Sequence, residues 1–351
     1  MITEECKVFN SSRDMGIDLG TANTLIYIKD KGVVLNEATV IAYDKRTARI
    51  IATGTKAKSM LGKAPKEIVV IRPLEDGVIS DFDMTAEMLE RFIRQALGDK
   101  RPSGLRVVVG VPSGVTDVEK KAVEEVVMNL GAREVYILDE PTAAAIGAGL
   151  DIDSSEASMV ADIGGGTSDI AILALGGIVV STSLRYAGDK FNEAIIQYVR
   201  KKKGVLIGDK TAEELKIRVG SAMVDKDDEG KEIIKQMSAR GRDLISGLPK
   251  TFKCTNKDME AALHESMEMI VDAVKNTVEK APPEIAADIA DKGMMLTGGG
   301  GMIENLDKLI AMKTGMEVAV ASQPYEAVAL GTGKSLEDVD KLMVYASDKK
   351  R

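Results

Sequence analysis

Residues 162–169 read DIGGGTSD and place three consecutive glycines between an aspartate and a threonine. The residues before this stretch are small or apolar and the run IAILAL follows it, which is typical of a turn that joins two buried strands. Residues without a Cβ adopt positive φ angles and let a ligand approach backbone N–H groups, as a phosphate-binding turn requires. A tight turn with spare glycines has the same composition, so this stretch alone leaves both interpretations open.

A second copy of the pattern favours the phosphate interpretation. Residues 16–34 read GIDLGTANTLIYIKDKGVV and residues 160–180 read VADIGGGTSDIAILALGGIVV. Asp18 and Asp162 are separated by far more residues than the period of a solenoid repeat, so the duplication predicts two related domains with one ligand between them. The turns expected to hold that ligand comprise Gly20, Thr21, Ala22, Asn23, Gly164, Gly165, Gly166 and Thr167.

Length and composition limit the class of protein. At 351 residues the chain exceeds a usual single core, which agrees with two domains. Its net charge of −8 argues against nonspecific nucleic-acid binding, since the longest cationic run is residues 200–203. The two cysteines, Cys6 and Cys254, fit no metal-binding spacing and favour a reducing cytoplasm. No apolar run approaches the ~20 residues that span a bilayer, and residues 1–14 lack the apolar core of a signal peptide.

Alternating strands and helices predict an α/β fold in both halves. Asp83 is expected to cap the first long helix, and Thr116 with Glu119 has the spacing of a capping box. A charged helical region is expected from about residue 190 to residue 250, and the single histidine, His264, is expected to be an ordinary helix residue. Helices are further predicted over residues 83–97, 116–131, 141–150 and 302–315, and buried strands over residues 106–112, 134–141 and 293–297.

Three further groups are expected at the ligand-binding edge of the sheets. Glu140 ends a predicted strand, where α/β proteins place ligands, and is a candidate base. Residues 297–301, TGGGG, run from a strand into a helix, so free N–H groups there suit an adenosine diphosphate moiety. Asp18 and Asp162 offer the oxygen ligands that Mg²⁺ prefers, and we expect them to hold it mostly through water.

Two other nucleotide motifs are incomplete. Residues 331–335, GTGKS, resemble the end of a P-loop, but Val328 occupies the position of the required earlier glycine. Residues 164–169 do not match the dinucleotide fingerprint, because Asp169 takes the place of the last glycine or alanine and a strand follows. A Walker-type site and a Rossmann dehydrogenase are therefore disfavoured.

The sequence resembles the superfamily of actin, Hsp70 and sugar kinases, and within it the MreB family of bacterial actin-like cell-shape proteins. The stretches that carry the resemblance cover nearly the whole chain and read GIDLGTANTLIY, IRPLEDGVISDF, VVVGVPSG, ILDEPTAAAIGAGL, DIGGGTSDIA, AGDKFNEAII, TAEELK and MLTGGGGMIENL. The resemblance implies an actin-like fold with two related domains that flank a nucleotide cleft. The first would comprise residues 1–150 and 318–351, with an insertion at about 33–66. The second would comprise residues 151–317, with an insertion at about 184–240.

The resemblance also implies roles for individual residues. Glu140 and Thr167 would position the water that attacks the γ-phosphate of ATP, with Mg²⁺ as cofactor and ADP as product. Glu213 and Lys216, in TAEELK, would contact the ribose and adenine. The resemblance implies slow turnover that depends on polymer state. Head-to-tail contact between copies would not close on itself, so it would generate open filaments. The loop that closes over the nucleotide would consist of Gly298, Gly299, Gly300 and Gly301.

A cytoplasmic location at the inner face of the cell membrane, together with cell-shape accessory proteins, is implied by the resemblance alone. Family members commonly carry an apolar loop tip or an amphipathic N-terminus. Here loop 98–104 reads GDKRPSG, and the N-terminus offers only Ile2, Val8 and Phe9 among polar residues. The basic tail of residues 336–351 would contact anionic lipid weakly, at about 1 kcal/mol for each basic residue. Packing of this tail helix on the first domain is the alternative.

Other classes of function stay open at this stage. A small-molecule kinase of the same fold needs a second substrate pocket with its own catalytic aspartate, and no further motif indicates one. An Hsp70-type chaperone needs a substrate domain, whereas the chain ends soon after the last predicted helix. A filament that binds ATP without cleaving it would carry the same motifs as a slow ATPase.

Overall fold

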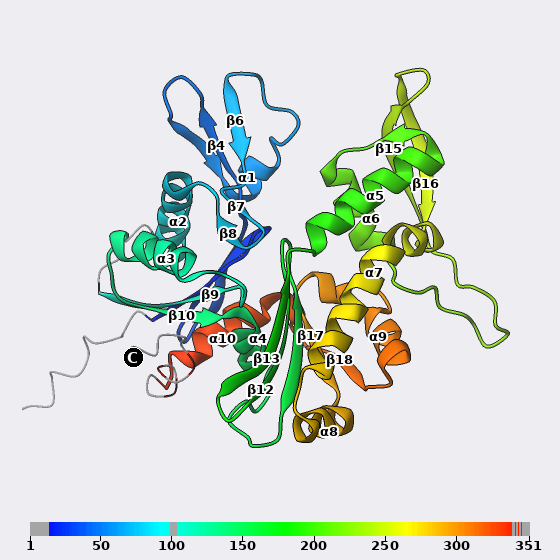
Figure 1. The fold of residues 1–351 in the computed structure, drawn as a ribbon. Coiled ribbons are helices and arrows are strands. Elements are labelled where there is room, and N and C mark those ends of the chain that lie inside the picture. The colour runs from blue at the N-terminus through cyan, green and yellow to red at the C-terminus, as the bar shows by residue number, and fades with distance from the viewer. Residues whose placement is uncertain (1–13, 99–103, 339–340, 342, 344, 346–351) are drawn as a thin grey trace, which may run out of the picture.

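The chain is built on two five-stranded sheets (Figure 1). The computed structural model describes residues 14–98, 104–338, 341, 343 and 345. The first sheet consists of β1 (Met15–Leu19), β2 (Asn23–Ile28), β3 (Gly32–Ala38), β9 (Leu105–Val111) and β10 (Ala132–Asp139). The second consists of β11 (Ser158–Ile163), β12 (Ser168–Ala174), β13 (Gly177–Leu184), β17 (Met294–Thr297) and β18 (Val318–Val320).

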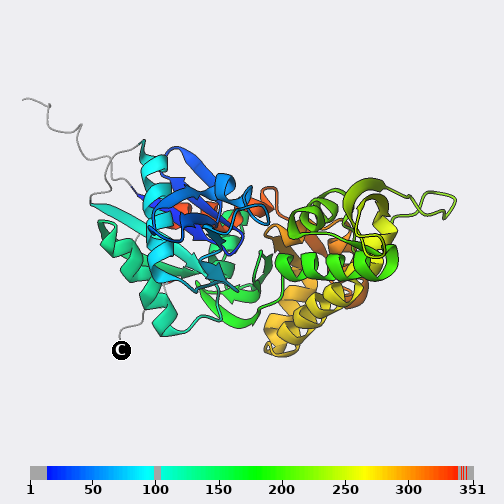
Figure 2. The same cartoon turned by 90° about the horizontal axis from the view of Figure 1, so that it is seen from above.

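The two sheets share one topology. The strand order is β10-β9-β1-β2-β3 in the first and β13-β12-β11-β17-β18 in the second. In each sheet the first three strands along the chain pair antiparallel, and the last two add in parallel. Seen from above, the two halves lie side by side (Figure 2). This equivalence confirms the α/β fold and the duplication predicted from the two turns.

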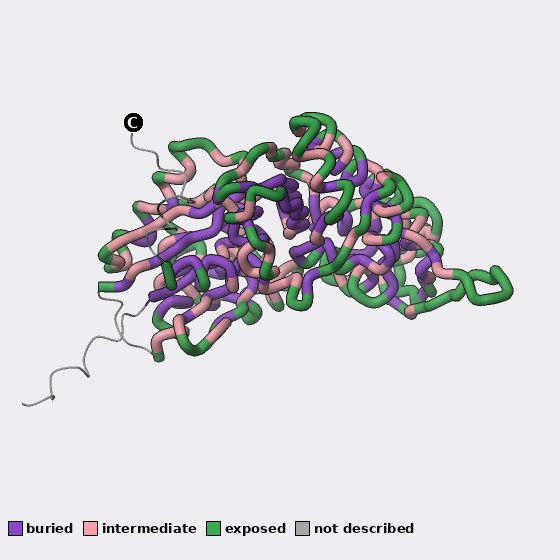
Figure 3. The backbone as a smooth tube through the Cα atoms, turned by 90° about the horizontal axis from the view of Figure 1, so that it is seen from below, coloured by how far each residue is buried: buried purple, intermediate pink, exposed green. Residues whose placement is uncertain are grey.

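Helices cover the sheets and supply apolar faces to the cores. On α2 (Phe82–Leu97) the apolar residues recur at helical spacing, and Met88, Phe92 and Ile93 are buried in the core of the first half. The other helices that pack on the first sheet are α3 (Asp117–Asn129), α4 (Glu140–Ala148) and α10 (Ala327–Ser335). Those of the second half are α5 (Gly188–Lys203), α6 (Asp209–Val219), α7 (Asn256–Glu279), α8 (Pro283–Lys292) and α9 (Leu306–Thr314). Figure 3 shows buried segments inside both halves and exposed ones at the periphery.

Each half also carries a small three-stranded sheet, and the two small sheets stand at the same end of the molecule (Figure 1). The first consists of β4 (Ile41–Asp44), β5 (Ile50–Thr53) and β6 (Ile68–Ile71), and α1 (Gly54–Lys58) packs beside it. The second consists of β14 (Val205–Leu206), β15 (Gln236–Asp243) and β16 (Pro249–Thr255), beside α5 and α6. The hairpin of β7 (Leu74–Glu75) and β8 (Val78–Ile79) leads from the first small sheet into α2.

The strand pairings move the predicted domain and insertion boundaries. β18 pairs with β17, so the second sheet continues past the boundary predicted after residue 317. β3 belongs to the first large sheet, so the first insertion begins after residue 38 rather than at 33, and β6 extends it past 66. β16 extends the second insertion from the predicted end at 240 to Thr255.

Two predictions about local structure are wrong. Asp81, not Asp83, caps α2, because its extended backbone lets the carboxylate accept a hydrogen bond from the N–H of Met84 at 3.0 Å. The region predicted as charged helix up to residue 250 contains the β15–β16 hairpin, in which Ala239 and Phe252 are buried between more exposed neighbours. That alternation has the period of a strand. The capping box at Thr116 is confirmed, and His264 is an exposed residue of α7.

Helices α4 and α10 cross in direct backbone contact. A Cβ on Gly147 would lie 1.8 Å from the carbonyl oxygen of Ala327, and a Cβ on Gly331 would lie 1.8 Å from that of Ala143. Only glycine permits such an approach. The close packing predicted for the small-residue helix at 141–150 is therefore confirmed, and residues 331–335, GTGKS, are part of a helix rather than a phosphate-binding loop.

None of the described helices combines the length and the apolar composition needed to cross a bilayer. Several segments discussed above lie outside the described residues. These are Ile2, Cys6, Val8 and Phe9, residues 99–103 of the loop, and residues 339–340, 342, 344 and 346–351 of the tail.

Candidate functional site

The two glycine turns meet at the centre of the molecule. The second turn is closed by a hydrogen bond from the N–H of Gly164 to the carbonyl oxygen of Thr167, at 2.9 Å. A Cβ on Gly165 would lie 2.5 Å from the Cβ of Ala22, and a Cβ on Gly166 would lie 2.5 Å from Oγ1 of Thr21. None of these three glycines has a positive φ angle, so that part of the prediction is wrong. Gly165 and Gly166 are required because the facing turns approach one another so closely, whereas a Cβ on Gly164 would meet only the carbonyl oxygen of Thr167, at 3.3 Å.

Each turn is tied back into its own half through its carbonyl oxygens. Oγ1 and the N–H of Thr39 donate to the carbonyl oxygens of Gly20 and Ala22, at 2.7 and 3.0 Å. At the start of α5 the N–H of Gly188 donates to Gly164 at 3.1 Å, and that of Asp189 donates to Gly165 at 2.8 Å. The carbonyl oxygens of the turns, which would repel an anion, are thereby engaged in hydrogen bonds within the protein.

One cleft of about 610 Å³ gathers the predicted site residues. Gly301 is the exception, because it lies beneath the loop, where a Cβ would meet Leu296 at 3.6 Å. Those that line the cleft are Asp18, Gly20, Thr21, Ala22, Asn23, Glu140, Asp162, Gly164, Gly165, Gly166, Thr167, Glu213, Lys216, Gly298, Gly299 and Gly300.

The loop after β17 differs from its prediction. Gly298 has a φ angle of +76°, and a Cβ there would lie 2.3 Å from the carbonyl oxygen of Ile163. Its N–H is not free, because it donates to the carbonyl oxygen of Pro324 at 2.7 Å. A 3-10 helix, η1 (Gly300–Met302), follows, and α9 begins only at Leu306. The expectation that a helix dipole acts on residues 297–301 is therefore wrong, since the α-helix starts too far along the chain.

Four carboxyl groups lie close together here: Asp18, Glu140 and Asp162 line the cleft, and Asp169 is buried beside them. Burial and then the nearby Asp162 raise the pKa of Asp18 to about 8, and burial raises that of Asp162 to about 7 although Thr297 donates to it at 2.7 Å. Burial, followed by the charge of Asp169, holds the pKa of Glu140 well above its ordinary value. The cluster therefore lacks compensating positive charge, which a bound cation would supply.

This electrostatic cost predicts that Asp18→Asn stabilises the protein in the absence of ligands. The unfolded carboxyl group ionises near its ordinary pKa and the folded one only near 8, so the folded state loses stability as pH rises between those values. We expect the melting temperature of the variant to exceed that of the wild type by about 2–5 °C at pH 8, and by less at pH 5. Calorimetry at both pH values tests this, and a difference that does not grow with pH would contradict it.

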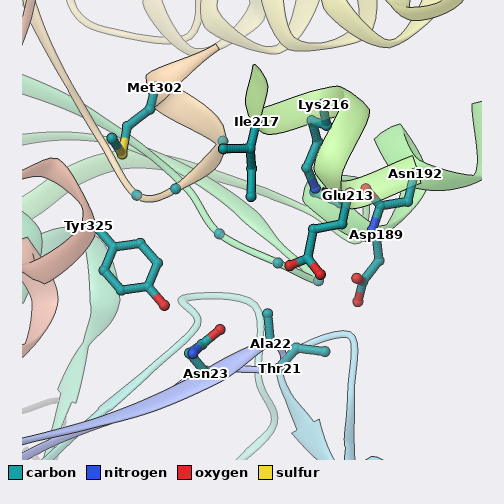
Figure 4. A pocket seen from close by; sticks show the side chains of 18 of the residues that line it. Thr21, Ala22, Asn23, Asp189, Asn192, Glu213, Lys216, Ile217, Met302 and Tyr325 are labelled. Carbon is teal, nitrogen blue, oxygen red and sulfur yellow. Dashed lines mark hydrogen bonds between the residues drawn. The ribbon is translucent and has the colours of Figure 1, made fainter. Parts of the chain in front are cut away.

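The two small lobes, which are the three-stranded sheets with the helices beside them, both contribute side chains to the cleft. Figure 4 shows those of Asp189, Glu213, Lys216 and Ile217 from the second lobe. Nζ of Lys216 donates to the carbonyl oxygen of Gly188 at 2.7 Å, and burial lowers its pKa to about 8. Glu213, three residues earlier on α6, forms an ion pair with Lys58 of α1 at 2.9 Å. The pair of Arg72 and Asp189, also at 2.9 Å, spans the cleft in the same way.

Sequence reasoning missed Lys58, Arg72 and Tyr325, which also line the cleft. Tyr325 lies in the short 3-10 helix η2 (Pro324–Glu326), and its hydroxyl is 3.4 Å from Oδ1 of Asn36 on β3. Lys58 and Arg72 come from the insertion of the first half and reach the cleft only because the two small lobes face each other. No spacing within the sequence indicates such neighbours.

Comparisons with known proteins agree with this geometry. A profile of the family described as "MreB/Mbl protein" matches residues 12–344. The chain is 46% identical over 331 residues to the cell shape-determining protein Mbl of Bacillus subtilis (strain 168), a match that covers 94% of this chain and 98% of that protein. It is 48% identical over 335 residues to the cell shape-determining protein MreB of Escherichia coli (strain K12), and 94% of each chain is covered.

Solved structures show the same fold. MreB 5 of Spiroplasma citri bound to AMPPNP matches with a TM-score of 0.88 at 35% identity, over 95% of this chain and 98% of that one. The protein of the MamK double helical filament matches with a TM-score of 0.77 at 20% identity, over 93% and 98% of the two chains, and this likeness concerns the fold alone. Agreement in profile, in identity along nearly the whole chain and in three-dimensional structure establishes that the chain belongs to the MreB/Mbl family of bacterial actin-like proteins.

Proposed function

We propose that this protein binds ATP with Mg²⁺ between its two halves, hydrolyses it slowly, and assembles head-to-tail into filaments that govern cell shape. The observation that carries the proposal is the pair of facing glycine turns above a cluster of buried carboxyl groups. The names of relatives support it, since Mbl and MreB are called cell shape-determining proteins. Structures of MreB5 of Spiroplasma citri hold AMPPNP and ADP.

The cleft has separate regions for the phosphates and the nucleoside. The two turns would receive the phosphates through backbone N–H groups. The nucleoside would lie between α6 and the loop Gly298–Gly300, near Glu213. Ile217 and Met302 line this part of the cleft with 74% and 58% of their surface exposed, and a bound base would cover such apolar side chains.

The residues present fit Mg²⁺ held mainly by water and phosphate. Asp18 and Asp162 stand on equivalent strands of the two sheets, and neither forms an ion pair among the described residues. No group of three metal-ligating side chains occurs in the part of the chain that the structure describes. Mg²⁺ accepts such a site, because it retains several waters and binds one or two carboxylates together with substrate phosphates.

Glu140 and Thr167 are the residues we assign to the attacking water. Glu140 opens α4 and is only 6% exposed, and its burial, followed by the charges of the surrounding carboxyl groups, raises its pKa well above the ordinary value. When bound, Mg²⁺ supplies positive charge that stabilises the transferring phosphoryl group. Positive charge bound near Glu140 would favour its carboxylate form, which can orient a water molecule and accept a proton from it.

Lys216 gives the proposed ATP site a testable pH dependence. Its ammonium group attracts an anionic ligand below a pKa of about 8 and loses its charge above that value. We expect the affinity for ATP, relative to that of Lys216→Arg, to fall about three- to tenfold between pH 7 and pH 9. The arginine variant is the reference because the carboxyl groups of Asp18 and Asp162 also titrate in this pH range. Their deprotonation favours the bound cation, so in the wild type alone it would mask the loss of charge on Lys216. Fluorescence titration with an ATP analogue measures it, and parallel curves would contradict a contact between Lys216 and the nucleotide.

Self-association and location complete the proposal. We infer an open, heterologous contact between copies, because a head-to-tail interface that does not close generates filaments. We also propose a place at the inner face of the cell membrane and contact with accessory proteins, and only family membership supports these two points. Sedimentation with Mg²⁺ and ATP tests assembly. Pelleting that requires ATP supports the filament, whereas a protein that transfers phosphate to a small molecule and never pellets would indicate a kinase instead.

A further inference from the structure

The two small lobes are joined across the mouth of the cleft by two ion pairs. Nζ of Lys58, at the end of α1, is 2.9 Å from Oε1 of Glu213 on α6. Nη1 of Arg72, just after β6, is 2.9 Å from Oδ2 of Asp189 in the first turn of α5. All four residues line the cleft, and their side chains are partly exposed, so the pairs lie between the cleft and solvent.

Each ion pair acts on a different end of the proposed nucleotide site. Glu213 is the residue assigned to the ribose, and Lys58 fixes one of its two carboxylate oxygens. The backbone N–H of Asp189 donates to the carbonyl oxygen of Gly165 at 2.8 Å, so the residue paired with Arg72 also supports the second glycine turn. The first half thus orients groups that belong to the second half at both ends of the nucleotide.

The four residues form one electrostatic group with Lys216. Besides burial, which lowers the pKa of Lys216, the charges of Asp189 and Glu213 raise it and those of Lys58 and Arg72 lower it, so all four lie within interaction range of Lys216. The group contains three cationic and two anionic side chains, an excess of positive charge that suits an anionic nucleotide.

We propose that Lys58 and Arg72 are positioning residues that hold Glu213 and Asp189 in place for the nucleotide and couple its retention to closure of the two small lobes. This inference rests on the proposed ATP site. The side chains of both pairs are 28–30% exposed, so water and salt weaken the pairs and the closure is readily reversed. The ion pairs between the two small lobes therefore slow nucleotide release without preventing it.

The test is the dissociation rate of a fluorescent ATP analogue from the full chain in the presence of Mg²⁺. We expect Lys58→Gln to accelerate release about three- to tenfold and Lys58→Arg to restore it to within about twofold, since the guanidinium reaches the same carboxylate. Lys56→Gln is the matched control, because Lys56 lies in the same helix, is exposed and undergoes the same change in charge.

The dependence of the release rate on salt is a second measurement, because residues that only support the fold would not change it. Release from the wild type should accelerate as salt rises from about 50 mM to about 500 mM, and the double variant Lys58→Gln, Arg72→Gln should show a smaller increase. Equal release rates in Lys58→Gln and Lys56→Gln, or equal salt slopes in the double variant and the wild type, would overturn the inference. Failure of the wild type itself to bind the analogue would instead overturn the proposed ATP site.

Discussion

Glu140→Gln lowers the rate of phosphate release from ATP by about a hundredfold or more, while the affinity for ATP stays within about threefold of the wild type. Glu140 is buried in the lining of the cleft and is the residue proposed to orient and deprotonate water, so its replacement should affect hydrolysis more than binding. The amide preserves size and hydrogen bonding but cannot accept the proton. Phosphate release and analogue binding, measured on the same samples, separate the two effects.

The matched control is Glu125→Gln, which makes the same chemical change at an exposed position of α3. It should leave both quantities unchanged. Hydrolysis by Glu140→Gln at more than about a tenth of the wild-type rate would remove Glu140 from the chemistry. The cleft would then still bind the nucleotide, but Glu140 would not be the residue that activates water.

Gly147→Ala destabilises the protein by about 3 kcal/mol or more, the largest stability effect we expect from adding one methyl group. The added Cβ would lie 1.8 Å from the carbonyl oxygen of Ala327, which belongs to the backbone of α10 and cannot rotate away. The two helices must separate, and α10 packs in turn on β1 of the first sheet. Thermal and denaturant unfolding measure the loss.

Gly208→Ala is the control for this substitution. No atom lies within 4 Å of a Cβ at Gly208 and its φ angle of −97° suits any residue, so the variant should lose no more than about 1 kcal/mol, the cost of alanine in place of glycine at the N-cap of α6. If Gly147→Ala were as stable as Gly208→Ala, the contact between α4 and α10 would be looser than the structure shows.

The parts of the site that repeat within the sequence could be predicted from it. Asp18 and Asp162 each sit in a strand–turn–strand pattern, and two copies of that pattern implied two sheets that face one ligand. Glu140 could be placed because a residue at the end of a parallel strand reaches the ligand-binding edge. The physical reason for the glycines of the second turn was only half right, since close contact of Gly165 and Gly166 with the facing turn requires them and not a positive φ angle.

The parts that depend on tertiary neighbours could not be predicted from residue patterns. Glu213 was placed only by resemblance, and its partner Lys58 lies far away in the sequence, on the opposite lobe. The β15–β16 hairpin was mistaken for helix because its charged residues conceal the alternation that buries Ala239 and Phe252. The late start of α9 follows from the left-handed backbone of Asn305, which no residue pattern indicated.

The central claim is that ATP hydrolysis in this cleft accompanies assembly of copies of the chain. The most direct test measures phosphate release and sedimentation on the same samples, with ATP and Mg²⁺, as protein concentration rises. We expect both signals to appear together above a threshold concentration, and Glu140→Gln to pellet without releasing phosphate. Release that increases in simple proportion to protein, with nothing in the pellet at any concentration, would contradict the account.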